Sequence, residues 1–536
     1  MGKRMITLYS ILIFCFSILI LRVYVLTQST DLTAAAASQS TYTVDVTKTR
    51  GAIYDANLNR LTDTKEDIIS VVAPNPESMM AVASNVTGPQ RQIILNQMTS
   101  GLPFLCQTGK KIYSKGIENF TVTKRWEDNA LAPHILGYLD GEGKAVNGIE
   151  LAYDQLLAEA GEEVKVRYTV DGMQSPLPES IPEIIGSSQP PKAGVVLTLD
   201  KEIQQMVQSV AEESIAAGAV VVMDVETGKI RACASVPTFS PSQVAQALQD
   251  QASPLFNRAF AGYSVGSTFK LAVAAAALEQ GVPTSTQETC LGGITVNGRM
   301  FYCHNRGGHG EVDMQEAIEQ SCNPYFVKLG QETGGANIIY MAQAMGFGAP
   351  AEFAPGVVSS GGYLPAVKEI TNNMDLANLS FGQGTLLATP VQIAAMVSSI
   401  ANGGYAVVPS LVEGITRDGK AVEPVQPEYV RNKIMSSTTA DTLRRFMVAV
   451  VEEGSGTGGK PEEGGAGGKT ASAQTGHYNE TGEEIVHAWF AGFFPEQQPK
   501  YAVVVLVEGG EFGGKVASPI FKRIADEIYS MEGKME

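Results

Sequence analysis

Cysteine is scarce in this chain, with only six among 536 residues. The six form no C-x-x-C pair, so the sequence has neither the cysteine density of a disulfide scaffold nor a paired metal-binding spacing. Basic residues are also few: 39 Lys and Arg stand against 56 Asp and Glu, for a formal net charge of −17. Because a nucleic-acid backbone is bound by clustered cations, we expect no nucleic-acid partner.

Charged residues of both signs make up only 18% of the chain, whereas hydrophobic residues make up an ordinary 44%. This balance excludes intrinsic disorder over most of the length. At about 150 residues per domain, the chain is long enough for about three to four domain equivalents and a sizeable core.

The N-terminus carries a long apolar run. After Lys3 and Arg4, residues 5–26 contain one charge, Arg22, whose side chain can reach lipid headgroups. The run approaches the ~20 residues that span a bilayer. We expect an uncleaved, single-pass signal anchor in the cell membrane, with the remainder extracytoplasmic by the positive-inside rule. A cleaved signal peptide is the alternative, with small residues for cleavage at Ala34–Ala37.

Composition divides the rest of the chain. A Pro-rich stretch near Ser175–Lys192 breaks both helical and strand periodicity and marks a domain boundary. The expected organisation is a cytoplasmic tail at 1–4, the anchor at 5–26, a stalk at 27–46, a mixed α/β region at 47–190 and a C-terminal domain at 191–536.

Strand-like patterns occur at both ends of the C-terminal domain, and helical patterns lie between them. This order predicts an α+β fold in which an antiparallel sheet is built from both ends. The expected elements are a helix at Lys201–Ala217, a hairpin formed by Ala219–Asp224 and Lys229–Ser235, strands at Ala488–Phe494 and Tyr501–Val507, and a last helix at Pro519–Met531.

Ser267 and Lys270 open an apolar helix predicted at Phe269–Leu278. Their i, i+3 spacing places them one turn apart on one helix face. A serine hydroxyl becomes nucleophilic when a base takes its proton, and a lysine amine can serve if burial disfavours its charge. Alone, this S-x-x-K pattern is weak, because a capping Ser followed by Lys is common.

Two further short motifs follow. Ser321-Cys322-Asn323-Pro324 lies where one helix-like run ends, and a capping role for Asn323 is the simpler structural reading. Lys469-Thr470-Ala471-Ser472 follows a Gly-rich loop and alternates like a strand, so it would offer a cation and hydroxyls to an extended substrate.

The order S-x-x-K, S-x-N, K-T-x is far more specific than any one motif. With Ser380–Gly384 and Trp489–Phe493, it resembles the transpeptidase domain of the penicillin-binding proteins over about residues 195–530. Arg50–Asp55 and His134–Tyr138 are similar to pedestal motifs of the class B, monofunctional members. The resemblance implies a penicillin-binding fold for residues 191–536 and a non-catalytic, dimerisation-type pedestal for 47–190.

The resemblance also implies a reaction, with no cofactor and no metal. Ser267 would be acylated by the D-Ala-D-Ala end of a peptidoglycan stem peptide, or by a β-lactam, with Lys270 as general base. Ser321 and Asn323 would relay protons and orient the peptide, and Lys469 would supply positive charge. Thr470 and Ser472 would hold the substrate carboxylate. The remaining substrate-binding candidates are Gln383 and Ala471, which stands where the family usually has Gly.

Three other motifs overlap or adjoin these residues. Gly262–Gly266 fits the G-x-S-x-G elbow of α/β-hydrolases, with Ser264 as nucleophile, but lacks a preceding strand pattern. Gly468-Lys469-Thr470 imitates a P-loop ending without its first glycine. Cys290, Cys303, His304 and His309 suggest zinc, but a 12-residue gap between the cysteines is not a finger spacing.

A two-residue hairpin is predicted at Asn297-Gly298. Its register places Cys290 and Cys303 diagonally, which leaves a disulfide between them open but not favoured.

We therefore expect a membrane-anchored peptidoglycan D,D-transpeptidase that works with a glycan-strand polymerase and other division or elongation proteins. A D,D-carboxypeptidase or β-lactamase on the same fold is the second hypothesis, because it uses the same motifs with water as acceptor. A catalytically minor β-lactam-binding scaffold is the third.

Overall fold

The computed structural model describes residues 2–28, 40–127, 129–425, 431–478 and 482–533. It divides into two compact units. Unit 1 contains Met1–Gly51, Asp63–Arg125 and Ala158–Pro191, and unit 2 contains Ala52–Thr62, Trp126–Leu157 and Lys192–Glu536. Within the predicted stalk, residues 29–39 lie outside the described residues and residues 41–46 belong to the first strand.

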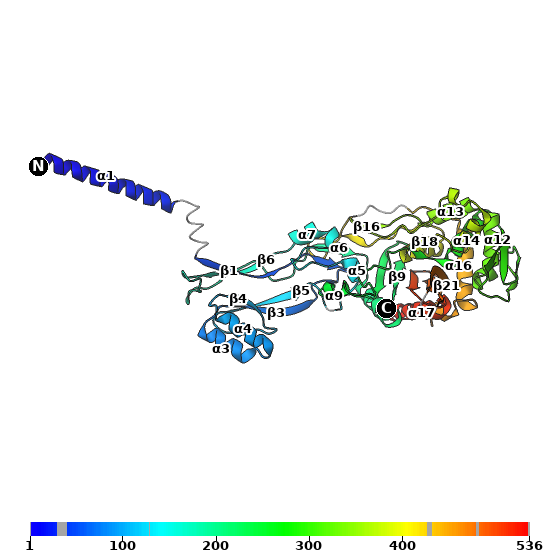
Figure 1. Ribbon diagram of the computed structural model, residues 1–536, viewed down its shortest axis with the longest axis horizontal. Coiled ribbons are helices and arrows are strands. Elements are labelled where there is room, and N and C mark those ends of the chain that lie inside the picture. The colour runs from blue at the N-terminus through cyan, green and yellow to red at the C-terminus, as the bar shows by residue number, and fades with distance from the viewer. Residues whose placement is uncertain (1, 29–39, 128, 426–430, 479–481, 534–536) are drawn as a thin grey trace. The chain divides into compact units, whose positions relative to one another are not determined.

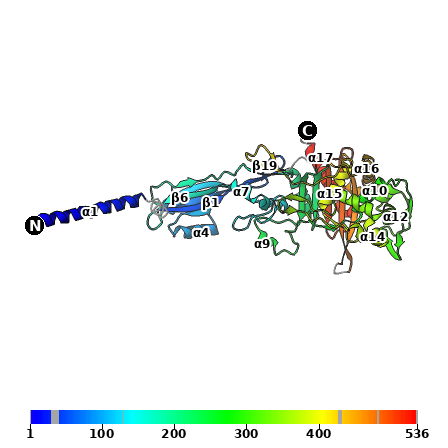
Figure 2. The same ribbon diagram turned by 90° about the horizontal axis from the view of Figure 1, so that it is seen from above.

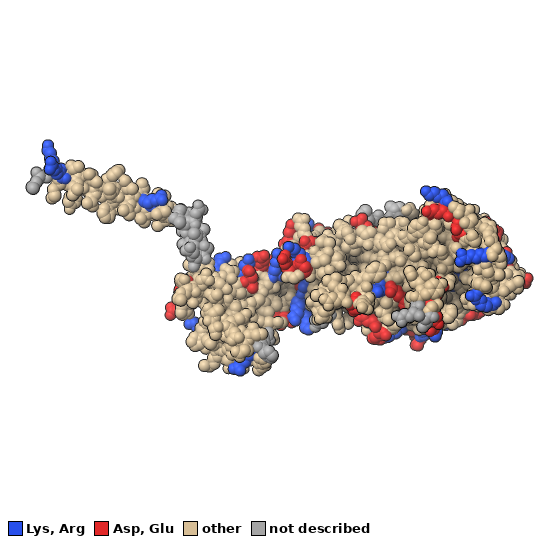
Figure 3. All heavy atoms as spheres, in the orientation of Figure 1, with Lys and Arg blue, Asp and Glu red and all other residues tan. Residues whose placement is uncertain are grey.

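The N-terminal helix α1 (Gly2–Thr27) is 26 residues long, and none of its residues is buried. The space-filling view shows basic residues near both ends of this helix and no charged residue between them (Figure 3). Its length and apolar composition suffice to cross a membrane, and it contains the predicted span 5–26. The helix is thus suited to anchor the chain in a membrane.

Unit 1 has two antiparallel sheets. One has the order β1-β6-β7 and the other β4-β3-β5. Valines of β1 and β6 share a core with Val71 and Phe120 of the second sheet. Helices α3 and α4 supply Val82 and Ile94 to a second core that includes Val72, which points to the opposite face of β3 from Val71. Figure 1 shows these two helices beside β3 and β4.

The bounds of the elements in unit 1 are β1 Thr41–Lys48, β3 Lys65–Val72, α3 Pro76–Asn85, α4 Pro89–Met98, β4 Phe104–Gln107, β5 Ile117–Lys124, β6 Glu163–Thr169 and β7 Glu183–Ile185.

Unit 2 is built on a five-stranded sheet of order β10-β9-β23-β22-β21. Every neighbouring pair is antiparallel. The strands are β9 Gly218–Asp224, β10 Ile230–Val236, β21 Gly467–Tyr478, β22 Glu484–Phe494 and β23 Tyr501–Val507. The sheet therefore combines strands from both ends of the domain, and the predicted α+β class is confirmed.

Both faces of this sheet are covered by helices, because alternate side chains of each strand point to opposite faces. Val220 and Val505 pack with α8 (Lys201–Ser214) and α17 (Gly513–Glu532) on one face. Val221 and Val504 on the other face belong to the core that includes α10, α15 and α16, which lie together in Figure 2.

The helices that contribute to this second core are α10 Lys270–Glu279, α11 Met314–Glu319, α12 Asn323–Thr333, α13 Gly335–Ala344, α14 Asn373–Ser380, α15 Pro390–Ala401 and α16 Ser437–Glu452. A smaller sheet of order β2-β8-β19-β20 is formed by Ala52–Tyr54, Gly194–Leu197, Val412–Thr416 and Glu423–Pro424. The short strands are β11 Tyr263–Ser264, β12 Glu288–Cys290, β13 Gly293–Val296, β14 Arg299–Tyr302, β15 Gly310–Val312, β16 Glu352–Ala354, β17 Val357–Val358 and β18 Leu387–Ala388. The short helices are α5 Pro133–Leu136, α6 Gly148–Ala152, α7 Asp154–Glu159 and α9 Val244–Ala247, with 3₁₀ turns η1 Gly266–Phe269, η2 Val367–Glu369 and η3 Thr457–Gly459.

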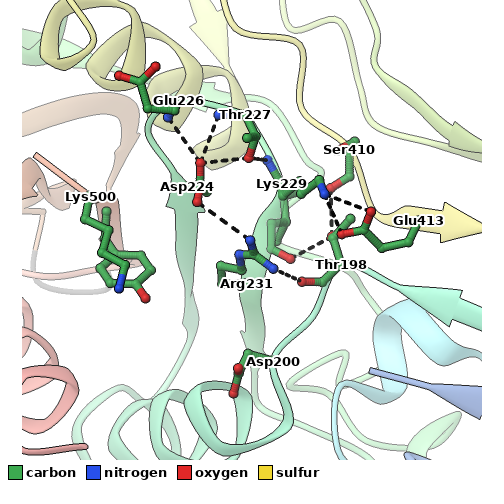
Figure 4. Close-up of polar contacts among 12 residues, drawn as sticks. Thr198, Asp200, Asp224, Glu226, Thr227, Lys229, Arg231, Ser410, Glu413 and Lys500 are labelled. Atoms are coloured by element: carbon green, nitrogen blue, oxygen red, sulfur yellow. Dashed lines mark hydrogen bonds and ion pairs between the residues drawn. The ribbon is translucent and has the colours of Figure 1, made fainter. Parts of the chain in front are cut away.

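The predicted hairpin of β9 and β10 is confirmed, and its turn is held by one carboxylate (Figure 4). Asp224 accepts hydrogen bonds from the backbone N–H and the hydroxyl of Thr227 at 2.9 and 2.7 Å. Arg231 lies 3.7 Å from the same carboxylate. Beside it, Lys229 pairs with Glu413 at 2.8 Å, so the hairpin is tied to β19.

Two predicted helix limits are wrong. Helix α8, predicted at Lys201–Ala217, ends at Ser214. Ile215 adopts an extended backbone there, and its side chain belongs to the core between α8, α17 and the sheet. The last helix begins at Gly513, six residues before the expected start at Pro519. Proline favours a first helical turn, but here the apolar face around Phe521 holds a longer helix against the sheet.

Candidate active site

Ser267 lies in the 3₁₀ turn η1, directly before α10. The residue before it, Gly266, has a positive φ of 54° and donates its N–H to the carbonyl of Gly382 at 3.0 Å. A Cβ on residue 382 would lie 1.9 Å from the carbonyl oxygen of Gly266. Only glycine, which has no Cβ, fits at this position without that clash. The Ser380–Gly384 segment therefore positions the turn that carries Ser267, a half-buried side chain.

Lys270 is the first residue of α10, and its side chain is fully buried. Its Nζ atom donates to the Ser321 carbonyl and to Asn323 Oδ1, both at 2.7 Å, and lies 3.3 Å from Ser321 Oγ. Burial lowers the pKa of Lys270 to about 8, although nearby thiols oppose the shift. A lysine with this pKa is partly neutral near physiological pH, as a general base must be.

Ser321 occupies the turn between α11 and α12 with a φ of 53°. A non-glycine residue rarely adopts this left-handed backbone, and such conformations gather at functional sites. The turn places Ser321 Oγ 3.3 Å from Lys270 Nζ and 3.0 Å from Lys469 Nζ. One hydroxyl thus bridges two lysines.

Lys469 lies on β21, the edge strand of the five-stranded sheet, where it pairs with Ala491. It is fully buried and also donates to the Thr470 carbonyl at 2.9 Å. Burial, with a smaller effect from the charge of Lys270, holds its pKa well below the ordinary lysine value.

Asn323 is not a helix cap, so the simpler structural reading of this residue is wrong. The N-cap of α12 is Cys322, with Asn323 and Pro324 as the first helical residues. The Asn323 side chain instead accepts from Lys270 and donates to the carbonyl of Tyr302 at 2.9 Å. The amide therefore joins the lysine to the β13–β14 hairpin.

The candidate substrate-binding residues are less tightly grouped. Thr470 is buried with its hydroxyl 2.7 Å from Ser455 Oγ, and Ser472 Oγ accepts from the backbone N–H of Gly513 at 3.3 Å. The Ala471 side chain points to the face of β21 opposite to Thr470 and Ser472. It lies close to the turn before Ser267, because a Cβ added to Gly266 would be 3.4 Å from the Ala471 methyl group. Gln383 is half-buried in the loop after α14, next to Gly382. The structure thus gathers Lys270, Ser321, Asn323 and Lys469 by direct contact. Ser267 precedes Lys270 by one turn, and Thr470, Ala471 and Ser472 follow Lys469 on β21.

A second cluster adjoins this group. Ligand atoms of Cys290, Cys303, His309 and Cys322 all lie within 4.8 Å of one another. The three cysteines are free thiols, so Cys290 and Cys303 form no disulfide. A hydrogen bond from Cys322 lowers the pKa of Cys303 and raises that of Cys322 itself. Cys322 comes from a turn 19 residues beyond Cys303, so the spacing of Cys290, Cys303 and His309 in the sequence does not reveal it as a member.

The two competing motif readings are wrong. An α/β-hydrolase elbow joins a strand of a parallel sheet to a helix, whereas Ser264 lies in the two-residue strand β11 of an antiparallel fold. A P-loop lies between a strand and a helix, whereas Lys469 lies inside β21.

The family profile "Penicillin binding protein transpeptidase domain" matches residues 218–526, more than half of the chain. This chain belongs to the penicillin-binding protein transpeptidase family. The resemblance to its class B members is confirmed among curated relatives, which include Stage V sporulation protein D of Bacillus subtilis. That relative is 30% identical over 411 residues, which are 73% of this chain and 61% of the relative.

Solved structures agree with the transpeptidase fold. Penicillin-binding protein A of M. tuberculosis, solved as a ceftriaxone acyl-enzyme complex, matches with a TM-score of 0.65 and 24% identity, covering 89% of this chain and 98% of that one. PBP2 of Helicobacter pylori, solved with MreC, matches with a TM-score of 0.64 and 22% identity, covering 92% and 99%. The chain spans less than two thirds of the length of the first curated relatives that it matches.

Proposed function

We propose that this chain is a peptidoglycan D,D-transpeptidase with Ser267 as its nucleophile. The observation that carries the proposal is the placement of Ser321 Oγ within 3.3 Å of two buried lysine amines, one of them a single helical turn after Ser267. A serine acyl transferase requires a base of lowered pKa within reach of its serine nucleophile, and Lys270 follows Ser267 by one helical turn. Membership of the transpeptidase family agrees with this assignment.

In the acylation step, Ser267 Oγ attacks the carbonyl carbon of the penultimate D-Ala of a stem peptide. The hydroxyl proton passes to neutral Lys270, and the backbone N–H groups of Ser267 and Ser472 receive the oxyanion. The C–N bond then breaks, and the proton reaches the leaving amine of the terminal D-Ala through Ser321. The ester on Ser267 replaces the amide of the substrate, so atoms and protons balance.

In the transfer step, an amine of a neighbouring strand attacks the ester. The amine loses a proton to the Lys270–Ser321 pair, and Ser267 recovers its own proton as the ester bond breaks. A new peptide bond joins the two strands, and the enzyme returns to its starting protonation state.

Substrate alignment follows from the position of β21. An extended peptide can add to the edge of a sheet through main-chain hydrogen bonds, and β21 is the edge strand of its sheet. Lys469 would attract the terminal carboxylate, and the hydroxyls of Thr470 and Ser472 would bind it after exchanging their present partners Ser455 and Gly513. Gln383 would line the opposite side of this strand site.

Anchoring by α1 would place the catalytic unit outside the cell, where peptidoglycan is assembled. Lys3 and Arg4 precede the apolar run, and positive charges remain on the cytoplasmic side. Partners would include a glycan-strand polymerase and proteins of elongation or division. A structural relative solved in complex with MreC supports a partner of this kind.

Gel labelling with a fluorescent penicillin tests the proposal. Wild type should be labelled and Ser267→Ala should not, whereas the matched control Ser264→Ala, three residues earlier, should keep its label. Equal labelling of wild type and Ser267→Ala would remove Ser267 as nucleophile. Rapid loss of label from wild type would favour a β-lactamase, and release of D-Ala without incorporation of an added amine would favour a carboxypeptidase. Labelling without turnover of a pentapeptide would favour a scaffold.

A further inference from the structure

Two adjacent residues of β11 tie the segment before Ser267 to the five-stranded sheet. The hydroxyl of Tyr263 donates to the carboxylate of Glu508 at 2.5 Å. The indole N–H of Trp489 donates to the carbonyl of Ser264 at 3.0 Å. Because Glu508 directly follows β23 and Trp489 lies on β22, both bonds join the segment that leads to Ser267 to the sheet.

The Tyr263 side chain is almost completely buried, with 9% of the residue exposed. Its ring packs edge-on against His487 and Trp489, at 5.3 and 6.3 Å between ring centroids. Burial, with a further effect from Glu508, raises the pKa of Tyr263, so the phenol keeps its proton and acts as the donor. Tyr263 therefore contacts β22 through its ring and the end of β23 through its hydroxyl.

Glu508 is itself held by an arginine. Arg258 Nε donates at 3.0 Å to the same carboxylate oxygen that accepts from Tyr263, and the Arg258 side chain is buried. The other two guanidinium nitrogens donate to the carbonyls of Ala252 and Ser253 at 2.9 and 3.2 Å. Because a charge-assisted hydrogen bond is stronger than a neutral one, Arg258 fixes the position of the carboxylate.

These contacts bear on the catalytic geometry because the nucleophile and Lys469 belong to different layers. Ser267 follows Ser264 by three residues, whereas Lys469 lies on β21, which pairs with β22. In that pairing Trp489 lies opposite Ala471. A shift of β11 against β22 would therefore move Ser267 relative to Lys469. A displacement of about 1 Å in a reacting geometry can slow the reaction about a hundredfold.

We propose that Tyr263 and Glu508 are positioning residues for Ser267. Glu508 holds the Tyr263 hydroxyl, and Tyr263 holds the strand that places the nucleophile, although 245 residues separate the two in the chain. This role rests on the proposed function, because Ser267 is taken as the nucleophile. Loss of the bond should slow the acylation step and leave the initial binding of a ligand unchanged, since β21 keeps its own pairing with β22.

Tyr263→Phe tests this role, because it removes the hydroxyl and keeps both the ring and the Arg258–Glu508 ion pair. Stopped-flow measurements on the full chain in detergent, at several penicillin concentrations, separate the acylation rate constant from the dissociation constant of the noncovalent complex. We expect Tyr263→Phe to lower the rate constant about tenfold or more and to keep the dissociation constant within about twofold of wild type.

Tyr501→Phe is the matched control. Tyr501 begins β23, is 6% exposed and donates its hydroxyl to Glu532 at 2.8 Å, so the variant removes a similar bond at another place. We expect it to lose about as much stability in thermal unfolding as Tyr263→Phe and to keep both wild-type constants. An equal fall of the acylation rate constant in the two variants would show general destabilisation and overturn the positioning role.

A second change tests whether Glu508 acts through Tyr263. Glu508→Gln keeps an oxygen acceptor and loses the charge, so the acylation rate constant should fall about threefold to tenfold. Added to Tyr263→Phe, it should lower the rate constant by no more than about a further twofold, because the shared bond is already lost. Glu413→Gln is the control: Glu413 is as exposed as Glu508, at 23% against 24%, and pairs with Lys229, so this variant should match wild type. Effects of the two changes that simply multiply would show separate actions and overturn the proposal.

The remaining outcomes separate this role from the proposed function. A Tyr263→Phe rate constant within threefold of wild type would overturn the positioning role and leave the proposed function in place. A loss confined to the dissociation constant would do the same, because Tyr263 would then act in ligand binding. A wild-type chain that no penicillin acylates would overturn the proposed function and the positioning role together.

Discussion

The Nζ atom of Lys469 lies 3.0 Å from the hydroxyl of Ser321, although 148 residues separate the two in the chain. The sheet supplies one member of this pair and the helical layer supplies the other. Because Lys270 reaches the same hydroxyl from a third segment, Ser321 is the only link in the described structure through which a proton could pass directly between the two lysine side chains.

Removal of this hydroxyl should therefore impair catalysis more than stability. We expect Ser321→Ala to slow penicillin acylation by a factor of about 10² to 10⁴, the range for loss of a proton-transfer group. Stopped-flow fluorescence with a reporter penicillin measures the rate, and thermal unfolding checks the fold. The exposed Ser242→Ala should match wild type in both. A Ser321→Ala rate within threefold of wild type would contradict the relay.

Acylation should depend on pH through Lys270. Its amine must be neutral to accept the Ser267 proton, and its pKa is lowered to about 8, so the neutral fraction rises with pH. We expect the acylation rate constant to rise about tenfold from pH 7 to a plateau above about pH 9. Lys270→Arg, which stays charged, should be at least a hundredfold slower at every pH. A wild-type rate that is flat from pH 6 to 9 would show that another group takes the proton.

Gly382 should be intolerant of a side chain because of its contact with Gly266. Gly382→Ala places a Cβ 1.9 Å from the Gly266 carbonyl oxygen. The matched control is Gly403→Ala, which has a similar φ of 83° and no heavy atom within 4 Å of the added Cβ. Both changes cost about 1–2 kcal/mol for the left-handed backbone. Only Gly382→Ala should also displace the Ser267 turn and abolish labelling by penicillin; equal labelling of the two variants would refute this role.

Ala471 should tune ligand affinity. Its buried methyl group fills the space between β21 and the turn at Gly266. We expect Ala471→Gly to change the apparent affinity for penicillins at least threefold without loss of acylation. Ala491→Gly, at an equally buried site on β22, should cost similar stability, about 1 kcal/mol, and leave that affinity unchanged. Identical titrations of all three proteins would show that the methyl group has no part in binding.

The fold class was predictable from the sequence because its signals are local. The β9–β10 hairpin follows from two apolar runs around Thr227-Gly228, and the Asn297-Gly298 turn produces the predicted pairing of Gly293 with Tyr302 through Val296 with Arg299. The limits of α17 were not predictable, because tertiary packing of its apolar face outweighs the preference of Pro519 for a first helical turn.

The site was predictable as a set of residue types and not as a geometry. The i, i+3 spacing predicts that Ser267 and Lys270 share one helix face. No local pattern reveals that Ser321 adopts a left-handed backbone, or that the N-cap of α12 is Cys322 and not Asn323. Cys322 lies 19 residues beyond Cys303, and only the folded chain brings the two thiols together. Contacts between distant segments depend on the whole core, which a linear motif does not encode.

Mapping of the acyl adduct tests the central claim most directly. The intact protein is treated with benzylpenicillin, digested with trypsin and sequenced by fragmentation in a mass spectrometer. Cleavage after Arg258 and Lys270 yields one peptide that contains both Ser264 and Ser267, so the fragment ions decide between them. We predict a single adduct on Ser267. An adduct on Ser264 or at another site, or no adduct on folded protein, would contradict the account.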